Sequence, residues 1–488
     1  MKLLVQDISR AKKAPLLVLF ALEGKTPETP EGLELPASFT KGFEGKARAT
    51  RETFTENKAW PHVLMVGLGD GDKLDSEGLR RAAAVAIRAA KAKQVTGVGF
   101  YVSPCVAELA GGEEATGRDI SEGAYLGAHV FAGIKKDSKP SSIKQLILWA
   151  SGAAFKRGAQ KGELMANACN FTRDLQDASG NNMRPRDLAA QAKKLATRSP
   201  QVRCRIFDEK AMAAFGMGLL LSVSQGSDEG AKLIHLTYKP KKKAKGIITF
   251  VGKGLTFDAG GISIKPSPKM EEMRYDMSGG AAVLGLFHAL GDLDLPYEVH
   301  GVVGASENTI NGKATKPGDI HVGMNGTSVE IQNTDAEGRL LLADCLTYAQ
   351  KKTKPDTLFD LATLTGAVIV GLGHELTGIF PSNDDLRDKL IESGERTGEY
   401  CWPLPLMDVH KDAMKGQVAD LKNIGPGSLG AGSTQGAAFL SYFIDEGQEW
   451  CHLDIAGTAW NAGSRDWSGG SLGTGVGTRL LIEYLERR

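Results

Sequence analysis

Short apolar runs alternate with helical patterns along almost the whole chain, and this alternation constrains the fold more than any other feature. In the N-terminal part, four runs have the length and composition of buried strands: PLLVLFAL (15–22), HVLMVGLG (62–69), VTGVGFYV (95–102) and SIKQLILWASG (142–152). The segment 79–92, LRRAAAVAIRAAKA, has helical periodicity. Strands interleaved with helices are typical of α/β folds.

The rest of the chain repeats this pattern over a greater length. Strands are expected at 246–252, 298–304, 328–333, 357–364 and 451–457, and helices at 278–290, 338–352, 384–395, 434–446 and 477–487. Asn325-Gly326 predicts a hairpin turn before strand 328–333. The basic run 238–246 joins two strands and is interpreted as a solvated connection.

A chain of 488 residues is too long for one typical core. Residues 156–175 predict a connecting helix, and the polar stretch QDASGNNMRPRD that follows predicts a loop. We therefore expect two α/β domains: a smaller N-terminal domain (1–155), a linker helix and loop (156–178), and a larger C-terminal domain (179–488). The larger domain is expected to have a central mixed sheet flanked by helices.

Charge and hydropathy exclude several classes of protein. The formal net charge is +1, which gives no attraction to nucleic acid or to a membrane surface. No apolar run approaches the ~18 residues needed to span a bilayer, and the N-terminal run is too short for a signal peptide. The six cysteines are scattered without a CxxC pair, which favours free thiols in a reducing compartment. We expect a cytoplasmic protein.

Asp335, Glu337 and Arg339 occupy every second position of IQNTDAEGRLLLAD (331–344). Residues two apart share a face only in an extended segment, so the spacing predicts that 335–339 is largely extended at a strand end. Ligands bind at such strand ends in α/β sheets. A charged surface turn before a helix accounts equally well for this segment alone.

A second segment, VGKGLTFDAGGISIKPS (251–267) followed by MRYDMSGG (273–280), favours the ligand-binding interpretation. It places Lys253, Asp258, Lys265 and Asp276 among glycines after an apolar strand. Four carboxylates repel one another unless cations lie among them. Oxygen ligands suit Mg, Mn, Co or Zn, and two ions sharing carboxylates would activate water and polarise a carbonyl.

Other catalytic motifs are absent or weak. There is no HExxH, Walker A or Rossmann GxGxxG sequence, and the GxSxG string at 469–473 has no apolar strand before it. His300 and His452 lie within apolar strands and are expected to be hydrogen-bonded core residues.

The motif NTDAEGRLLLAD resembles the signature of the leucyl (cytosol) aminopeptidase family of dinuclear metallo-exopeptidases. VGKGLTFDAGGISIKPS and MRYDMSGGAAVLG resemble the family's other site segment. Further similarity lies in TRDL (172–175), DLATLTGA (360–367) and ADLKNIGPGSLGAGSTQGAAFL (419–440). The resemblance covers residues 165–488 and implies a metal-dependent aminopeptidase. The linker stretch QDASGNNMRP differs from the sequence that is more common in the family at this point.

The resemblance assigns a role to each site residue. Asp258 and Glu337 resemble the carboxylates that bridge two Mn or Zn ions, Lys253 and Asp276 the other ligands of one ion, and Asp335 a ligand of the second. Lys265 resembles the catalytic lysine that polarises the scissile carbonyl and stabilises the oxyanion. Arg339 resembles the arginine that holds bicarbonate as general base.

Substrate and assembly also follow from the resemblance. The free amine of a peptide would bind one metal and Asp276, and leucine or another apolar first residue would enter a pocket. The implied pocket residues are Met273, Thr363, Gly366, Ala456 and Ala459, although Met273 could equally be a core residue and the small Ala459 argues against a strict leucine preference. The family forms homohexamers, as dimers of trimers with active sites facing an interior cavity, and the N-terminal domain would serve oligomerisation or regulation.

Two other functions stay open. Some bacterial relatives act as DNA-binding accessory or regulatory proteins, and Lys135, Lys136, Lys139 and Lys144 are the residues that could serve this role here. The balanced charge and the lack of a DNA-binding motif argue against it. Two-metal phosphoryl hydrolysis uses similar ion pairs, but it calls for basic phosphate clamps that the sequence does not indicate.

Overall fold

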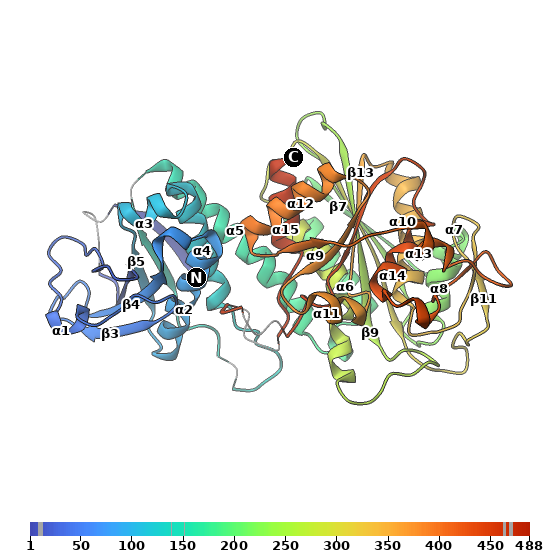
Figure 1. Ribbon diagram of the computed structural model, residues 1–488, viewed down its shortest axis with the longest axis horizontal. Helices are drawn as coiled ribbons and strands as arrows, with labels where there is room; N and C mark the ends of the chain where they lie inside the picture. The colour runs from blue at the N-terminus through green and yellow to red at the C-terminus, as the bar shows by residue number, and fades with distance from the viewer. Residues whose placement is uncertain (8–12, 138, 151, 462–464, 468–471) are drawn as a thin grey trace. The chain divides into compact units, whose positions relative to one another are not determined.

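The computed structural model describes residues 1–7, 13–137, 139–150, 152–461, 465–467 and 472–488. The chain forms two compact units, each with its own sheet (Figure 1). The smaller unit comprises residues 1–170, 396–398 and the described part of 463–470, and the larger unit comprises the rest. The predicted two-domain α/β architecture is confirmed.

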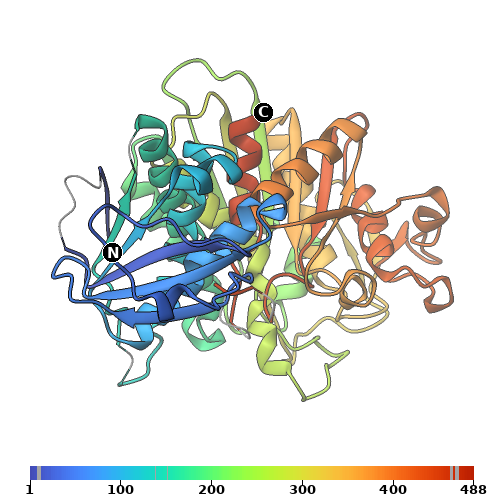
Figure 2. The same ribbon diagram turned by 60° about the vertical axis from the view of Figure 1, so that its left-hand side comes forward.

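The smaller unit contains a six-stranded sheet in the order β1-β6-β5-β2-β4-β3, which is parallel except for the β3–β4 pair. Its strands β1 to β5 are blue in Figure 2. Alternate residues of β2 face two separate cores, one of which is built with the alanine-rich α2. The strands are β1 (Lys2–Gln6), β2 (Leu16–Leu22), β3 (Thr50–Phe54), β4 (His62–Gly69), β5 (Gly97–Tyr101) and β6 (Gln145–Trp149). The helices are α1 (Ala37–Thr40), η2 (Gly71–Lys73), α2 (Ser76–Ala92), α3 (Pro104–Leu109), α4 (Glu113–Ala128) and α5 (Ala153–Asp177), whose residues from 171 onward belong to the larger unit.

The larger unit contains an eight-stranded mixed sheet in the order β15-β14-β17-β13-β9-β10-β8-β7. Its four central strands run parallel, and β9 lies between β13 and β10. Most apolar residues of β9 are buried because both faces of the sheet are covered. The strands are β7 (Val202–Phe207), β8 (Lys232–Tyr238), β9 (Ile247–Asp258), β10 (Glu298–Asn308), β13 (Thr357–Ala362), β14 (Thr377–Pro381), β15 (Cys401–Pro403) and β17 (Glu449–Asp454).

Helices cover both faces of this sheet. Figure 1 shows α6, α9 and α15 on one side and α8, α10 and α14 on the other, where they form one apolar core with the sheet. The helices are η3 (Gly180–Asn182), α6 (Pro185–Arg198), α7 (Glu209–Phe215), α8 (Gly218–Ser224), η4 (Met270–Met277), α9 (Ser278–Leu290), α10 (Gly338–Thr353), α11 (Gly366–Leu372), α12 (Asp384–Thr397), α13 (Asp408–Asp412), η5 (Gly427–Leu429), α14 (Gly432–Ser441) and α15 (Thr478–Arg487).

A third, small sheet combines β11 (Ile320–Val322), β12 (Ser328–Glu330) and β16 (Leu421–Lys422). Strands β11 and β12 form the predicted hairpin, with Gly326 at φ +93° in the connection. The strand expected at 328–333 ends at Glu330 and pairs in this small sheet, so its expected extent was wrong. Beyond Glu330 the backbone no longer pairs with a neighbouring strand. Instead, the side-chain amide of Asn423 forms hydrogen bonds with backbone groups of residues 332–336.

Several other sequence expectations have clear outcomes. All six cysteines are free thiols. No helix in the described part of the chain is both long enough and apolar enough to cross a membrane. The lysines at 135, 136, 139 and 144 are exposed. The GxSxG string at 469–473 lies mostly outside the described residues.

His300 and His452 are buried and hydrogen-bonded, as predicted. His452 Nδ1 lies 2.6 Å from Asp360 Oδ1, and His300 Nδ1 lies 3.0 Å from Nε2 of His235, whose Nδ1 lies 3.1 Å from the Tyr348 hydroxyl. Burial lowers the pKa of both His235 and His300 to about 4, below the ordinary value of 6.5.

This histidine pair predicts a loss of stability in mild acid. The unfolded chain takes up protons near pH 6.5, whereas folded His235 and His300 resist protonation until about pH 4. Stability is therefore fully present above pH 6.5 and falls as the pH drops toward 4, by on the order of 2 kcal/mol for each histidine. Chemical denaturation at pH 7.5 and pH 5 measures the loss. An unchanged loss in His300→Gln would contradict this attribution.

Candidate metal centre

The carboxyl end of β9 provides two of the predicted site residues. Lys253 lies just beyond the last residue of β9 that pairs with β13, and Asp258 ends the strand. Both side chains are almost fully buried, at 2% exposure each. The Asp258 carboxylate is fixed by the backbone N–H of Gly260 and by Asn308 Nδ2, each at 2.8 Å. Gly260 has φ +88°, which allows this sharp turn at the strand end.

The turn 333–336 and the start of α10 bring in the next residues. Asp335 lies in the turn, Glu337 is the N-cap of α10, and Arg339 is its second residue. The expectation of an extended segment over 335–339 was wrong, because Glu337 already has helical dihedral angles. A turn followed by a helix start, rather than a β pleat, brings Asp335 and Glu337 to the same side.

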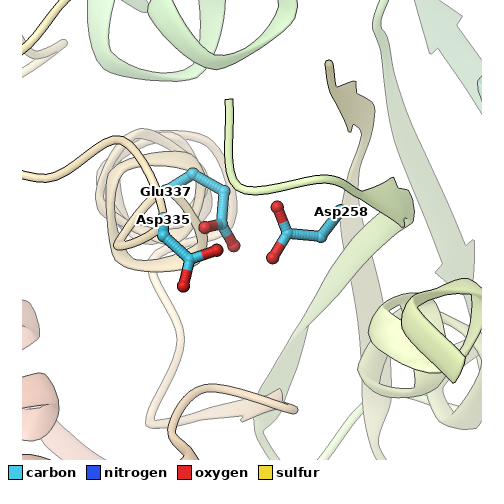
Figure 3. A group of neighbouring side chains, drawn as sticks. All are labelled: Asp258, Asp335 and Glu337. Carbon is cyan, nitrogen blue, oxygen red and sulfur yellow. The ribbon is translucent and has the colours of Figure 1, made fainter. Parts of the chain in front are cut away.

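Three carboxylates converge at this point. One oxygen from each of Asp258, Asp335 and Glu337 lies within 4.8 Å of the others. Figure 3 shows the three side chains pointing toward one another, Asp258 from the end of β9 and the other two from the turn and the start of α10. Mutual repulsion opposes such a cluster unless cations neutralise it.

Two lysines neutralise the cluster in this structure. Lys253 Nζ lies 2.8 Å from Asp276 Oδ2 and 2.9 Å from Glu337 Oε1. Lys265 Nζ, from the loop after β9, lies 2.7 Å from Asp258 Oδ2 and 2.5 Å from Asp335 Oδ1. Burial opposes the charge of both lysines, but the carboxylates outweigh it and raise the pKa of each.

The pKa values of three of the carboxyl groups are also raised, which for an acid favours the uncharged form. Burial, reinforced by the neighbouring Asp258, raises the pKa of Glu337 to about 8, and burial raises that of Asp276 to about 6. The pKa of Asp335 is also raised, by burial and by Asp258. Glu337 Oε2 is buried and has no hydrogen-bond partner among the described residues. Such a group is short of positive charge, and the donor set fits divalent cations.

Thr363 and Gly338, from neighbouring segments of the chain, contact Lys253 and Asp276. Thr363 follows β13, accepts a hydrogen bond from Lys253 Nζ through its carbonyl at 3.0 Å, and donates its hydroxyl to Asp276 Oδ1 at 2.6 Å. Gly338 packs against Lys253, since a Cβ atom there would lie 2.5 Å from Lys253 Nζ and would displace the end of the lysine side chain. The glycine of the EGR motif thus leaves space for the lysine.

An open cavity of about 1010 Å³ lies over these groups. All seven predicted metal and catalytic residues line it: Lys253, Asp258, Lys265, Asp276, Asp335, Glu337 and Arg339. Met273, Thr363, Gly366 and Ala456 also line it, whereas Ala459 is fully buried and does not. Trp460 is the aromatic residue in this lining, held by a 3.0 Å hydrogen bond from its Nε1 to Glu272.

Two polar residues of the site escaped the sequence analysis. Asn308 donates its amide to Asp258, and Asn423 accepts a 2.8 Å hydrogen bond from Arg339 Nη1 through its backbone carbonyl. Asn308 ends β10, the parallel neighbour of β9, so its place at a strand end was the available signal. Asn423 lies within the motif ADLKNIGPGSLGAGSTQGAAFL, but the sequence of this motif does not indicate which residues Asn423 contacts.

Carboxylates, lysines and an arginine around one cavity, at the carboxyl end of a parallel strand pair, define a metal-dependent hydrolase. The family model described as the cytosol aminopeptidase family, catalytic domain, matches residues 170–482, and the N-terminal domain of the same family matches residues 20–138. The chain therefore belongs to the cytosol aminopeptidase family.

Individual relatives agree with this membership. A probable cytosol aminopeptidase of Bdellovibrio bacteriovorus is 41% identical over 88% of this chain and 86% of its own length. A probable cytosol aminopeptidase of a Geobacter species is 41% identical over 92% of this chain and 90% of its own length. Among solved structures, a tomato leucine aminopeptidase mutant has a TM-score of 0.88 at 31% identity, covering 100% of this chain and 97% of its own. The bottromycin maturation enzyme BotP in complex with Mn has a TM-score of 0.86 at 30% identity, and the match covers 97% of this chain and 99% of that enzyme's chain.

Proposed function

We propose that this protein removes the first residue from peptides with a free N-terminus, with leucine or another apolar side chain preferred, by means of two divalent ions. The observation that carries the proposal is the convergence of four carboxylates and Lys253 around one cavity, in a chain of this family. Mn or Zn would suit this donor set, and Mg or Co could replace them.

In this proposal Asp258 and Glu337 would help to hold both ions, Lys253 and Asp276 would hold one of them, and Asp335 would hold the other. Lys253 would bind as a neutral amine, which a neighbouring dication favours over the ammonium form. When bound, the ions supply Lewis-acid polarisation of the carbonyl and lower the pKa of water.

Lys265 and Arg339 then act on the substrate side of the site. Lys265 carries a charge at neutral pH and reaches into the cavity, where it would stabilise negative charge developing on the scissile carbonyl oxygen. Burial lowers the pKa of Arg339 to about 10, so it also stays charged at neutral pH and cannot accept a proton. Its role in the proposal is to hold a small anion such as bicarbonate, which supplies a general base.

The free amine of the substrate would be recognised by one ion and Asp276, whose carboxylate is oriented by Thr363. This explains a restriction to N-terminal residues. The first side chain would lie against Met273, Gly366 and Ala456 in the same cavity. A homohexamer and a cytoplasmic location remain part of the proposal through family membership.

Metal removal tests the function directly. Hydrolysis of leucine p-nitroanilide is expected to fall to background after chelator treatment and to return on addition of Mn²⁺ or Zn²⁺, because the carboxylate cluster then regains its cations. N-acetyl-leucine p-nitroanilide, whose amine is blocked, should not be cleaved. A panel of other first residues and a phosphate ester complete the assay. Silence on every peptide substrate, with ions restored, would exclude the aminopeptidase.

A further inference from the structure

A single buried side chain holds both ends of the turn that presents Asp335. Asn423 follows β16 and is fully buried, 90 residues beyond Asn333 in the chain. Its Oδ1 accepts hydrogen bonds from the backbone N–H groups of Gln332, at 2.8 Å, and Asn333, at 3.3 Å. Its Nδ2 donates to the carbonyls of Asn333, at 2.5 Å, and Ala336, at 3.4 Å. The amide thus replaces a strand partner for residues 332–336.

Thr334 ties the middle of the turn to the loop after β9, since its hydroxyl donates to the Gly260 carbonyl at 2.7 Å and its carbonyl accepts from Asn308 Nδ2 at 3.0 Å. The ends of the turn depend on Asn333 and Asn423. Within it, Ala336 N–H donates to the Asn333 carbonyl at 3.2 Å, and Asp335 N–H donates to Asn333 Oδ1 at 2.8 Å. Both contacts depend on Asn333, which Asn423 in turn orients. Carboxylates that share an ion must be held within about 0.5 Å of their productive positions. Loss of the Asn423 amide would leave the backbone groups of Gln332, Asn333 and Ala336 unpaired, so the ends of the turn on either side of Asp335 could shift.

The same residue also holds Arg339. The backbone carbonyl of Asn423 accepts from Arg339 Nη1 at 2.8 Å, and its backbone N–H donates to the Glu330 carbonyl at 3.0 Å. Arg339 Nε has no hydrogen-bond partner among the described residues, so the bond from Nη1 to the Asn423 carbonyl anchors the guanidinium. One residue therefore fixes the carboxylate turn and the arginine relative to each other.

We propose that Asn423 is a positioning residue of the metal centre: its side-chain amide sets the turn that carries Asp335 and leads to Glu337, and its carbonyl aligns Arg339 with that turn. The proposal rests on the proposed function, because Asp335 and Glu337 are metal ligands only there. Asn423 touches neither the ions nor the substrate in this scheme and acts through the residues it holds.

Asn423→Asp keeps the size of the side chain but removes both amide donors and sets a carboxylate against two carbonyl oxygens. Calorimetric titration of the metal-free full-length protein with Mn²⁺ is expected to show binding weakened by about 10- to 100-fold. With leucine p-nitroanilide at saturating Mn²⁺, kcat should fall by about 10-fold or more while KM changes by less than about 3-fold, since the first-residue pocket is untouched. Asn423→Ala, which adds no charge beside Arg339, should weaken Mn²⁺ binding similarly.

Gln350→Glu is the matched control. Gln350 is likewise buried, lies on α10 with Arg339, and bonds backbone groups through its amide, but at the far end of the helix from the site. Both substitutions should lower the thermal stability of the metal-free protein, whereas only the Asn423 variants should weaken Mn²⁺ binding. Wild-type affinity in folded Asn423→Asp and Asn423→Ala would overturn the inference. A wild type that binds Mn²⁺ but cleaves no peptide would instead reject the proposed function.

Discussion

Glu337→Gln is expected to abolish peptide hydrolysis, with kcat/KM reduced by more than about 10³-fold, while leaving the metal-free protein more stable than wild type. The substitution removes one of the two carboxylates proposed to hold both ions. Because the ions lose a shared ligand, the activity that depends on them is lost as well. The same substitution relieves a cost in the metal-free protein. Burial and the neighbouring Asp258 raise the pKa of Glu337 to about 8, and an uncharged amide avoids that penalty.

The sign of this stability effect follows from linkage. A carboxyl whose folded pKa is raised contributes stability below its unfolded pKa, near 4.5, and loses it as the pH rises toward 8. At pH 7.5 we expect metal-free Glu337→Gln to be more stable by on the order of 2 kcal/mol. Thermal unfolding with and without Mn²⁺ measures both effects: wild type should gain stability from the ion and the variant should not. A variant stabilised by Mn²⁺ as strongly as wild type would rule out Glu337 as a ligand.

Lys265→Ala is expected to lower kcat by about 10²- to 10³-fold with little change in Mn²⁺ affinity. Lys265 is proposed to stabilise the developing oxyanion, and removal of one such donor typically has an effect of this size. It is not a proposed ligand, and among the described residues its Nζ pairs with Asp258 and Asp335. Steady-state kinetics and calorimetric titration with Mn²⁺ together separate its role from that of Lys253.

The controls for this prediction are two lysine substitutions. Lys241→Ala removes an exposed lysine from the connection between β8 and β9 and should leave kcat unchanged. Lys253→Ala should lose Mn²⁺ affinity together with activity, because Lys253 is proposed as a ligand. If Lys265→Ala lost Mn²⁺ binding to the same degree as Lys253→Ala, Lys265 would belong to the ligand set and not to oxyanion stabilisation.

The central strands were the most predictable part of the fold. Strands β9, β10 and β13 are buried on both faces, so each contains a largely apolar run that can be recognised without knowing its partner strand. Edge strand β7 alternates polar and apolar residues with two arginines and was not predicted. The first turn of helix α6 was included in the loop predicted for QDASGNNMRPRD, a stretch rich in Gly, Asn and Pro, although Pro185 in fact occupies that first helical turn.

The candidate site was predictable where its charged residues lie close together in the chain. Lys253, Asp258 and Lys265 lie within one strand and its loop, and a carboxylate-rich set indicated cations. The path of the chain between them was not predictable. The spacing of Asp335 and Glu337 suggested a pleated strand, but Asn423, far along the chain, stabilises a turn there instead. Such a long-range contact leaves no local signal in either segment.

The order in which the pieces of the metal centre appear along the chain has a consequence for protein synthesis. The proposed ligands lie between Lys253 and Glu337, but Thr363, which bonds both Lys253 and Asp276, comes later, and Asn423 later still. Strand β13, which flanks β9, also follows the last ligand. A chain still on the ribosome thus carries every ligand before it has the parts that arrange them. Under the proposed function, the metal centre would be complete only once the chain as far as Asn423 has left the ribosome.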